Sequence, residues 1–497
     1  MWKARVNFCN ERCADARRWR LAGATQLGML NCTQAEDSWV LNATELRHNA
    51  HRAANSLASK QLLAHRRMQN VLRRGGTVLA TFLGGSVVTG QTLRNCATGI
   101  SGPACAYPAR AEKWMQQCSG LAGRFQVANQ ATGGTTTISI LPQLPEFFQG
   151  TSELGCEGSE PKLVVIDFST NDAVFNSGSD PASQAKSPLL AATEVMLRWL
   201  LIERPCIGIL MLDSDCTLPS HGKHHGTREV HQRAANHYGV AYLSFGSGFR
   251  DGIRCTRDPP VWTRSLRGSH PGPDSHQHVA DELSLWLPRF FEVAGKDSVH
   301  HRDHTSVGYN TSLPPPIASE EALAKHEICR QPVTTYSALA REYTQHGPWP
   351  RMQVTNGTWE LNRERADKPG WQSDEGGSVL TFEMQFGAEP RLTIVYEQSY
   401  ETFGDLKLSM RGSPNCSKSC IGHQSLTLPG RDLTQKSNAT QATTLVVQLG
   451  DDKSMLQQGV FLPKYWNVPP FGNATVYLTN LGQGARQRVK VRRVSSC

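Results

Sequence analysis

The chain has 497 residues, 14 cysteines and a formal net charge of +9. This length predicts two or three domains, each large enough to bury a core. The positive charge is spread over short basic runs, and no nucleic-acid-binding motif accompanies them. We therefore interpret the charge as favouring solubility and expect no nucleic-acid partner. The basic runs are Arg17–Arg20, Arg66–Arg67, Arg73–Arg74 and Arg486–Arg493.

The cysteines and the glycosylation sequons indicate the compartment. An even number of cysteines together with an excess of Asn-x-Ser/Thr sequons is typical of an oxidising, secretory environment. No stretch has the roughly 18 strongly apolar residues of a membrane helix, and the first residues show no signal-peptide core. We expect a secreted or secretory-lumen glycoprotein whose leader is absent from this chain. The sequons begin at Asn31, Asn42, Asn310, Asn356, Asn415, Asn438 and Asn473.

Residues 1–74 are predicted to form an N-terminal arm and one helix. The first 44 residues carry three cysteines and no clear hydrophobic period, so we expect an irregular arm. From Glu45 to Arg74 the apolar residues recur with a spacing near 3.6, which predicts an amphipathic helix.

The next stretch, Gly75–Leu93, predicts a buried strand that ends at a serine. Thr77 to Leu83 is short, uncharged and apolar, as in a strand covered on both faces. Gly84 and Gly85 then favour a sharp turn that presents Ser86. The turn is not the G-x-S-x-G elbow, because Val88 replaces the second glycine.

Strands and helices alternate from this serine to residue 295. Such alternation predicts right-handed crossovers and a parallel sheet, whose functional site lies beyond the carboxyl ends of the strands. Ser86, Gly134 and Asn171 all follow predicted strands, so we expect them at one edge. The other predicted strands are 124–129, 163–168, 206–216 and 239–245, and the predicted helices are 105–118, 189–203, 228–238 and 275–293.

Residues 296–328 have the composition of a linker, stiffened by Pro314–Pro316. Two groups of histidines are candidate metal ligands. They are His300, His301 and His304 in the linker, and His221, His224, His225 and His231 before it. Neither group has partners at a metal-ligand spacing, so we interpret both as solvated and expect no metal.

Residues 329–497 follow a different pattern. Short alternating runs, such as SVLTFEMQF and NATVYLTNL, are separated by Gly, Pro, Asn and Asp. This pattern predicts an antiparallel β-sandwich. No catalytic constellation is visible in it, and its aromatic residues are expected mainly in the core.

A serine nucleophile needs a base, and His270 is the candidate. In GSHPGPDSHQHVADEL, His270 precedes a proline at the entry to the last predicted helix. This placement brings the imidazole to the same sheet edge as Ser86.

Four segments together resemble the SGNH (GDSL-type) hydrolase family over residues 75–295. They are LGGS with Ser86, NQATGG with Gly134, STND with Asn171 and SHPGPDSHQHVAD with His270. The resemblance implies a three-layer α/β/α sandwich with a five-stranded, mostly parallel sheet. It further implies Ser86 as nucleophile, His270 as base, and an oxyanion hole formed by the Ser86 N–H, the Gly134 N–H and the Asn171 side chain.

One position departs from the family pattern. Arg267 stands where the family usually has an aspartate, three residues before the histidine. An arginine would oppose protonation of the imidazole. Asp258, Asp251 or Asp274 is a candidate replacement for the triad acid, or a backbone carbonyl holds the ring.

The sequence therefore predicts a secreted serine esterase that needs no cofactor and acts on an acylated carbohydrate or lipid ester, including O-acetyl groups. Three alternatives remain open. The first is an O-acyltransferase that uses the same site. The second is a weak or inactive relative that binds glycans. The third is nucleotide binding by the stretch GSVVTGQT, which nearly fits a phosphate-binding loop but has Gln91 in place of the lysine that reaches the phosphates.

Overall fold

The computed structural model describes residues 43–90, 93, 102–118, 123–148, 162–172, 187–214, 224–245, 270–296, 313–324, 326, 328, 333–338, 352–362, 369–399, 403–412, 425–430, 441–449, 468, 470–484 and 487–497. The chain divides into two compact units. The first unit comprises Met1–Gly133 and Gln149–Leu323, and the second comprises Gly134–Phe148 and Ala324–Cys497.

The first unit contains a five-stranded sheet in the order β2-β1-β3-β4-β5, and every neighbouring pair is parallel. Parallel neighbours cannot be joined by tight hairpins, so crossover connections that contain helices join them. The strands are β1 (Val78–Gly84), β2 (Phe125–Asn129), β3 (Lys162–Asp167), β4 (Gly208–Asp213) and β5 (Ala241–Ser244).

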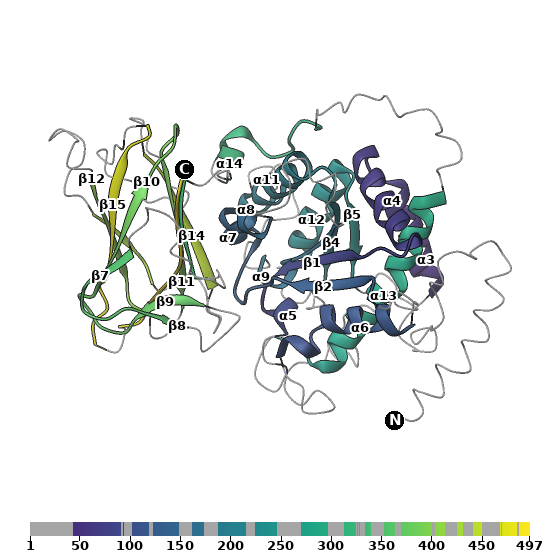
Figure 1. The fold of residues 1–497 in the computed structure, drawn as a ribbon, viewed down its shortest axis with the longest axis horizontal. Helices are drawn as coiled ribbons and strands as arrows, with labels where there is room; N and C mark the ends of the chain where they lie inside the picture. Colours follow the sequence, from purple (N-terminus) through teal and green to yellow (C-terminus); the bar gives the residue numbers. More distant parts are fainter. Residues whose placement is uncertain are drawn as a thin grey trace. The chain divides into compact units, whose positions relative to one another are not determined.

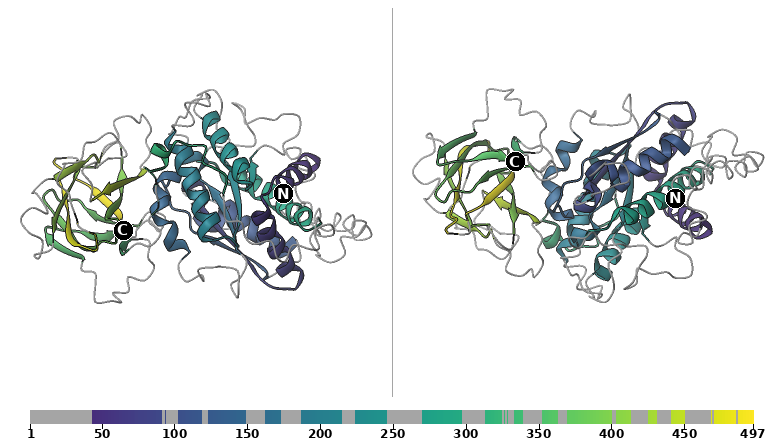
Figure 2. Two further views of the ribbon diagram at one scale, coloured as in Figure 1. Left: turned by 90° about the horizontal axis from the view of Figure 1, so that it is seen from above. Right: turned by 90° about the horizontal axis from the view of Figure 1, so that it is seen from below.

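Helices cover both faces of this sheet (Figures 1 and 2). One layer holds α3, α4 and α6 against α13, whose apolar residues Leu283, Leu287 and Phe290 recur at helical spacing and are buried. The other layer holds α11 and α12. The helices are α3 (Ala43–Asn55), α4 (Ser59–Arg73), α5 (Ser86–Thr89), α6 (Tyr107–Cys118), α9 (Ser169–Asp172), α11 (Pro188–Glu203), α12 (His224–Tyr238) and α13 (Pro273–Lys296), with the 3₁₀ turn η1 (Gly102–Cys105).

The second unit is a β-sandwich of two antiparallel sheets. One has the order β13-β12-β15-β10-β7, and the other has the order β14-β11-β16-β9-β8 with β6 paired to β16. Its core draws Phe382 and Val476 from the first sheet and Ile394 and Val494 from the second. The strands are β6 (Thr334–Ser337), β7 (Met352–Asn356), β8 (Glu360–Asn362), β9 (Gly370–Ser373), β10 (Val379–Gln385), β11 (Arg391–Gln398), β12 (Leu406–Gly412), β13 (Ser425–Leu428), β14 (Gln441–Gln448), β15 (Asn473–Asn480) and β16 (Val489–Ser496).

The predicted fold class, an α/β sandwich followed by an antiparallel β-sandwich, is confirmed. The single helix predicted from Glu45 to Arg74 is instead two helices, because the chain is extended at Ala58, where the backbone N–H donates to the Gly239 carbonyl. Part of the predicted linker also packs on the first unit: the N–H groups of Ile317 and Ala318 donate to the buried carboxylate of Glu194 in α11.

The basic run Arg486–Arg493 was counted with the charge that favours solubility, but its last two arginines are buried. Arg492 and Arg493 lie in β16 with only 1% of each side chain exposed. Arg492 donates to Glu397 in β11, and Arg493 pairs with Glu146. Since a buried charge is tolerated only when it is paired, these two carboxylates explain how a basic strand enters the core.

Glu146 belongs to a segment that leaves the α/β sequence and joins the sandwich. Gly134–Phe148 falls between β2 and β3 in the chain, yet it packs with the second unit. It contains α7 (Thr137–Ile140), η2 (Leu141–Gln143) and α8 (Leu144–Phe147). The Gly134 carbonyl accepts a hydrogen bond from the Ala442 N–H in β14, at 2.9 Å. The remaining helix, α14 (Glu320–Ala324), lies where the chain passes from the first unit to the second.

Glu146→Gln should lower the free energy of unfolding by roughly 3 kcal/mol, because it leaves the buried Arg493 guanidinium without its counter-charge. Urea unfolding of the full chain measures this loss. The matched control is Glu389→Gln in the same unit, since Glu389 pairs with Arg391 but is 80% exposed. We expect the control to cost less than about 1 kcal/mol. Equal losses in the two variants would contradict the account.

Candidate active site

The structure brings Ser86 and His270 together. The Ser86 Oγ–H and the His270 Nε2 lie at 2.6 Å, although the two residues are 184 positions apart in the chain. Ser86 is the first residue of α5, directly after β1, and His270 stands three residues before α13. The hydroxyl is therefore within reach of a base, the geometry that a serine nucleophile requires.

Gly84 allows β1 to run close beside β3 just before the serine. Gly84 pairs with Asp167 in the parallel register, and a Cβ on Gly84 would lie 2.2 Å from Val88 Cγ2 and 2.5 Å from the Asp167 carbonyl oxygen. Any other residue would push the strand ends apart. The glycine thus keeps the ends of β1 and β3 at one narrow edge.

Asn129 shapes the loop after β2 at the same edge. Its side-chain amide donates to the Val88 carbonyl at 2.9 Å, and its side-chain oxygen accepts from the Ala131 N–H at 3.1 Å. Thr132 then donates its N–H to the Gly84 carbonyl. These bonds hold the loop that leads to Gly134, where the chain takes a positive φ of 73°.

The other predicted site residues are placed as follows. Asn171 lies in α9, the short turn that follows β3, with its backbone N–H donating to the Phe168 carbonyl. Gly134 is the first residue of the segment grouped with the second unit. Asp274 belongs to the first turn of α13, but its side chain lies outside the described residues, as do Asp251, Asp258 and Arg267.

Two buried polar clusters that the sequence analysis missed lie beside α9. In the first, the Asp167 carboxylate accepts hydrogen bonds from the hydroxyls of Tyr107, Ser169 and Ser214. Burial raises the pKa of Asp167 from 3.8 to about 6, against the lowering effect of the hydrogen bonds. This cluster ties α6, α9 and the end of β4 to the end of β3.

The second cluster is built on His231 of α12, which is 2% exposed. Its Nδ1 lies 2.7 Å from Asp213 Oδ1 and its Nε2 lies 3.2 Å from Asp172 Oδ2. The hydroxyl of Tyr242 donates to the other oxygen of Asp213. The expectation that His231 is solvated was therefore wrong. The signal was its helical spacing from the buried Ala234 and Ala235, which places it on the inner face of α12.

The two carboxylates hold His231 in its protonated form. Burial alone lowers the pKa of this imidazole, but the charges and hydrogen bonds of Asp213 and Asp172 outweigh it and raise the pKa from 6.5 to about 10. Since both ring nitrogens donate in the cation, each carboxylate receives one N–H.

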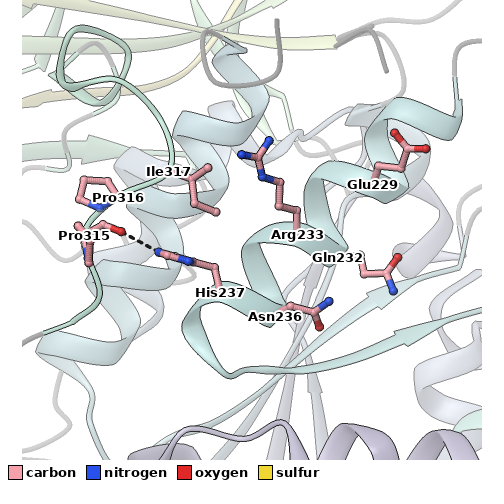
Figure 3. A pocket seen from close by; sticks show the side chains of 8 residues that line it. All are labelled: Glu229, Gln232, Arg233, Asn236, His237, Pro315, Pro316 and Ile317. Atoms are coloured by element: carbon pink, nitrogen blue, oxygen red, sulfur yellow. Dashed lines mark hydrogen bonds between the residues drawn. The ribbon is translucent and has the colours of Figure 1, made fainter. Parts of the chain in front are cut away.

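A groove on the outer side of α12 is separate from this chemistry (Figure 3). It runs between α12 and residues Pro315–Ile317, and His237 donates from Nε2 to the Pro315 carbonyl at 2.7 Å. Within the part of the chain that the structure describes, no group of three His, Cys, Asp or Glu side chains is arranged to hold a metal ion.

None of the helices among the described residues combines the length and apolar character needed to cross a membrane.

The protonated His231 predicts how stability depends on pH. Its folded pKa lies above its ordinary value, so its stabilising contribution is complete below pH 6.5 and is lost as the pH rises towards 10. The urea unfolding free energy should therefore fall across this window. In Asp213→Asn the folded pKa of His231 should be lower, because its main partner is uncharged. The fall should then still begin near pH 6.5, the unfolded pKa, but should end at lower pH and be smaller in total. An identical pH profile in both proteins would contradict this assignment.

No protein-family model matches the chain, and no curated protein matches it by sequence. Solved structures of similar fold were found. One is a two-domain esterase (CEX) active on acetylated mannans, at 15% identity and a TM-score of 0.48, covering 86% of this chain and 95% of that one. Another is a family two carbohydrate esterase from Cellvibrio japonicus, at 20% identity and a TM-score of 0.30, covering 44% of this chain and 62% of that one.

A third is a protein assigned to the G-D-S-L lipolytic family, from Desulfitobacterium hafniense DCB-2. It is 14% identical with a TM-score of 0.28, and the match covers 41% of this chain and 97% of that one. All three descriptions are of esterases or lipolytic proteins. The description of the third names the GDSL family, which the four sequence blocks of this chain resemble.

Proposed function

We propose that this chain is a serine ester hydrolase that removes O-acyl groups, with Ser86 as the nucleophile and His270 as the base. The observation that carries the proposal is the 2.6 Å contact between Ser86 Oγ and His270 Nε2 at the carboxyl edge of a parallel sheet. A hydroxyl alone is a weak nucleophile at neutral pH, and an adjacent imidazole activates it by accepting its proton.

The proposed reaction has two halves. Ser86 Oγ attacks the ester carbonyl carbon while its proton passes to His270 Nε2. The tetrahedral oxyanion then collapses, the alkoxide takes the proton from His270 and leaves as the alcohol, and an acyl-enzyme remains. Water attacks this acyl group, His270 accepts the water proton and returns it to Ser86, and the carboxylic acid is released.

The oxyanion would be stabilised by the Ser86 N–H, the Gly134 N–H and the Asn171 side-chain amide. Asn171 is supported by its place in α9, because β3 neighbours β1 and the turn follows the carboxyl end of β3. For His270 Nδ1, the proposed partner remains a carboxylate among Asp251, Asp258 and Asp274, or a backbone carbonyl.

The proposed substrates are acylated, including O-acetylated, carbohydrates or small lipid esters, and secretion would bring the enzyme to them. Support for a secretory protein comes from Cys105, Cys206 and Cys497, each of which is in a disulfide. The sequon asparagines Asn356 and Asn473 are exposed, as glycosylation requires. Secretion of a tagged full chain and digestion of its glycans would test this.

Ser86→Ala should abolish both hydrolysis of p-nitrophenyl acetate and covalent labelling by a fluorophosphonate, since the attacking oxygen is gone. Thr89→Ser is the matched control, because it keeps a hydroxyl in the same short helix. Comparing the rates at which the parent protein hydrolyses acetylated mannan and a short-chain glycerol ester shows whether the alcohol part of the substrate is a carbohydrate or a lipid. Labelling or turnover that survives in Ser86→Ala would exclude this residue as the nucleophile.

Asn171→Ala should lower kcat by ~10² to 10³ with a smaller change in KM, because an oxyanion donor acts mainly in the transition state. Steady-state kinetics with p-nitrophenyl acetate measures the two constants separately. An unchanged kcat would remove Asn171 from the oxyanion hole while leaving the Ser86–His270 pair intact.

A further inference from the structure

The α9 turn is fastened at both ends by buried side chains. At its start, the Ser169 hydroxyl donates to Asp167 at 2.8 Å. At its end, Asp172 lies 3.2 Å from His231 Nε2 and is fully buried. Asn171 stands between these two fastened residues, so the direction of its backbone depends on both.

His231 also reaches across to the end of the neighbouring strand. Its second nitrogen contacts Asp213, the last residue of β4, while the rest of α12 packs on β4 and β5. The imidazole therefore joins three elements that are far apart in the sequence, namely α9, α12 and β4. Both of its nitrogens are occupied by carboxylates, which leaves no lone pair for service as a second general base.

We propose that His231 is a positioning residue for the oxyanion site: clamped between Asp172 and Asp213, it fixes the α9 turn and thereby aims Asn171. The inference rests on the proposed function, because it assumes that Asn171 stabilises an oxyanion formed at Ser86.

The opposite charges of His231 and its two carboxylate partners strengthen the contacts between them. Hydrogen bonds in which both partners are ionised are stronger than neutral ones, and burial excludes the water that would compete for them. The groups that face this imidazole are Asp172 from α9 and Asp213 from β4. Tyr242 from β5 faces Asp213 and has a pKa held well above 10.0, by burial first and then by Asp213, so it stays neutral. The net arrangement is one cation between two anions.

The test is a double-mutant cycle on His231 and Asn171, read as kcat and KM for p-nitrophenyl acetate. His231→Gln should lower kcat by ~10²-fold with little change in KM, since a small misplacement of a catalytic group costs about this much. In the Asn171→Ala background the same substitution should change kcat by less than about threefold, because the group that it aims is already absent.

His237→Gln is the matched control, since His237 lines the groove on the outer side of the same helix and its Nε2 donates to the Pro315 carbonyl. It should leave kcat within about twofold of the parent protein. Circular dichroism checks that each variant is folded. If His231→Gln does not fold, Asp172→Asn and Asp172→Ala replace it. The amide keeps a hydrogen-bond acceptor for His231, so Asp172→Asn should retain more kcat than Asp172→Ala.

The outcomes separate the inference from the function on which it rests. Equal fold-losses from His231→Gln in both backgrounds would show that His231 does not act through Asn171, and would overturn the inference alone. An unchanged kcat in His231→Gln, or equal kcat in the two Asp172 variants, would overturn it as well. Full activity in Ser86→Ala would overturn the proposed function and the inference together.

Discussion

The close pairing of β1 with β3 at Gly84 and Asp167 is the constraint on which the site depends. Without a Cβ at Gly84, the two strands run side by side to their last residues, so α5 and α9 begin at the same edge of the sheet. That edge receives Ser86 from one strand and Asn171 from the other. His270, three residues before α13, lies at the same edge although it is 184 positions from Ser86 in the chain.

The buried carboxylates beside this edge all have hydrogen-bond partners. Asp167 gathers three hydroxyl donors, while Asp172 and Asp213 share one imidazolium. An unpaired carboxylate at this depth would cost several kcal/mol, so each is surrounded by its own donors. These bonds hold both ends of the turn that carries Asn171. The proposed oxyanion role of Asn171 needs such support, because oxyanion donors must be aimed before the charge develops.

The β-sandwich also buries charged side chains, among them arginines paired with glutamates. Its strand β16 places Arg492 and Arg493 in the interior, where Glu397 and Glu146 compensate them. Because Glu146 comes from a segment between β2 and β3, one of these two counter-charges is supplied from the middle of the α/β sequence. Neither unit therefore corresponds to a single continuous stretch of the chain.

Periodicity and strand ends in the sequence determined the α/β order, the parallel sheet, the later sandwich and the placing of Ser86, Asn171 and His270 at strand or helix ends. These are local signals, since hydrophobic spacing reports which side of an element is buried. Only the tertiary structure decided that the helix from Glu45 breaks at Ala58, that Arg493 is buried and that His231 joins Asp172 to Asp213. Each of these depends on a partner far away in the chain, and no local spacing carries that information.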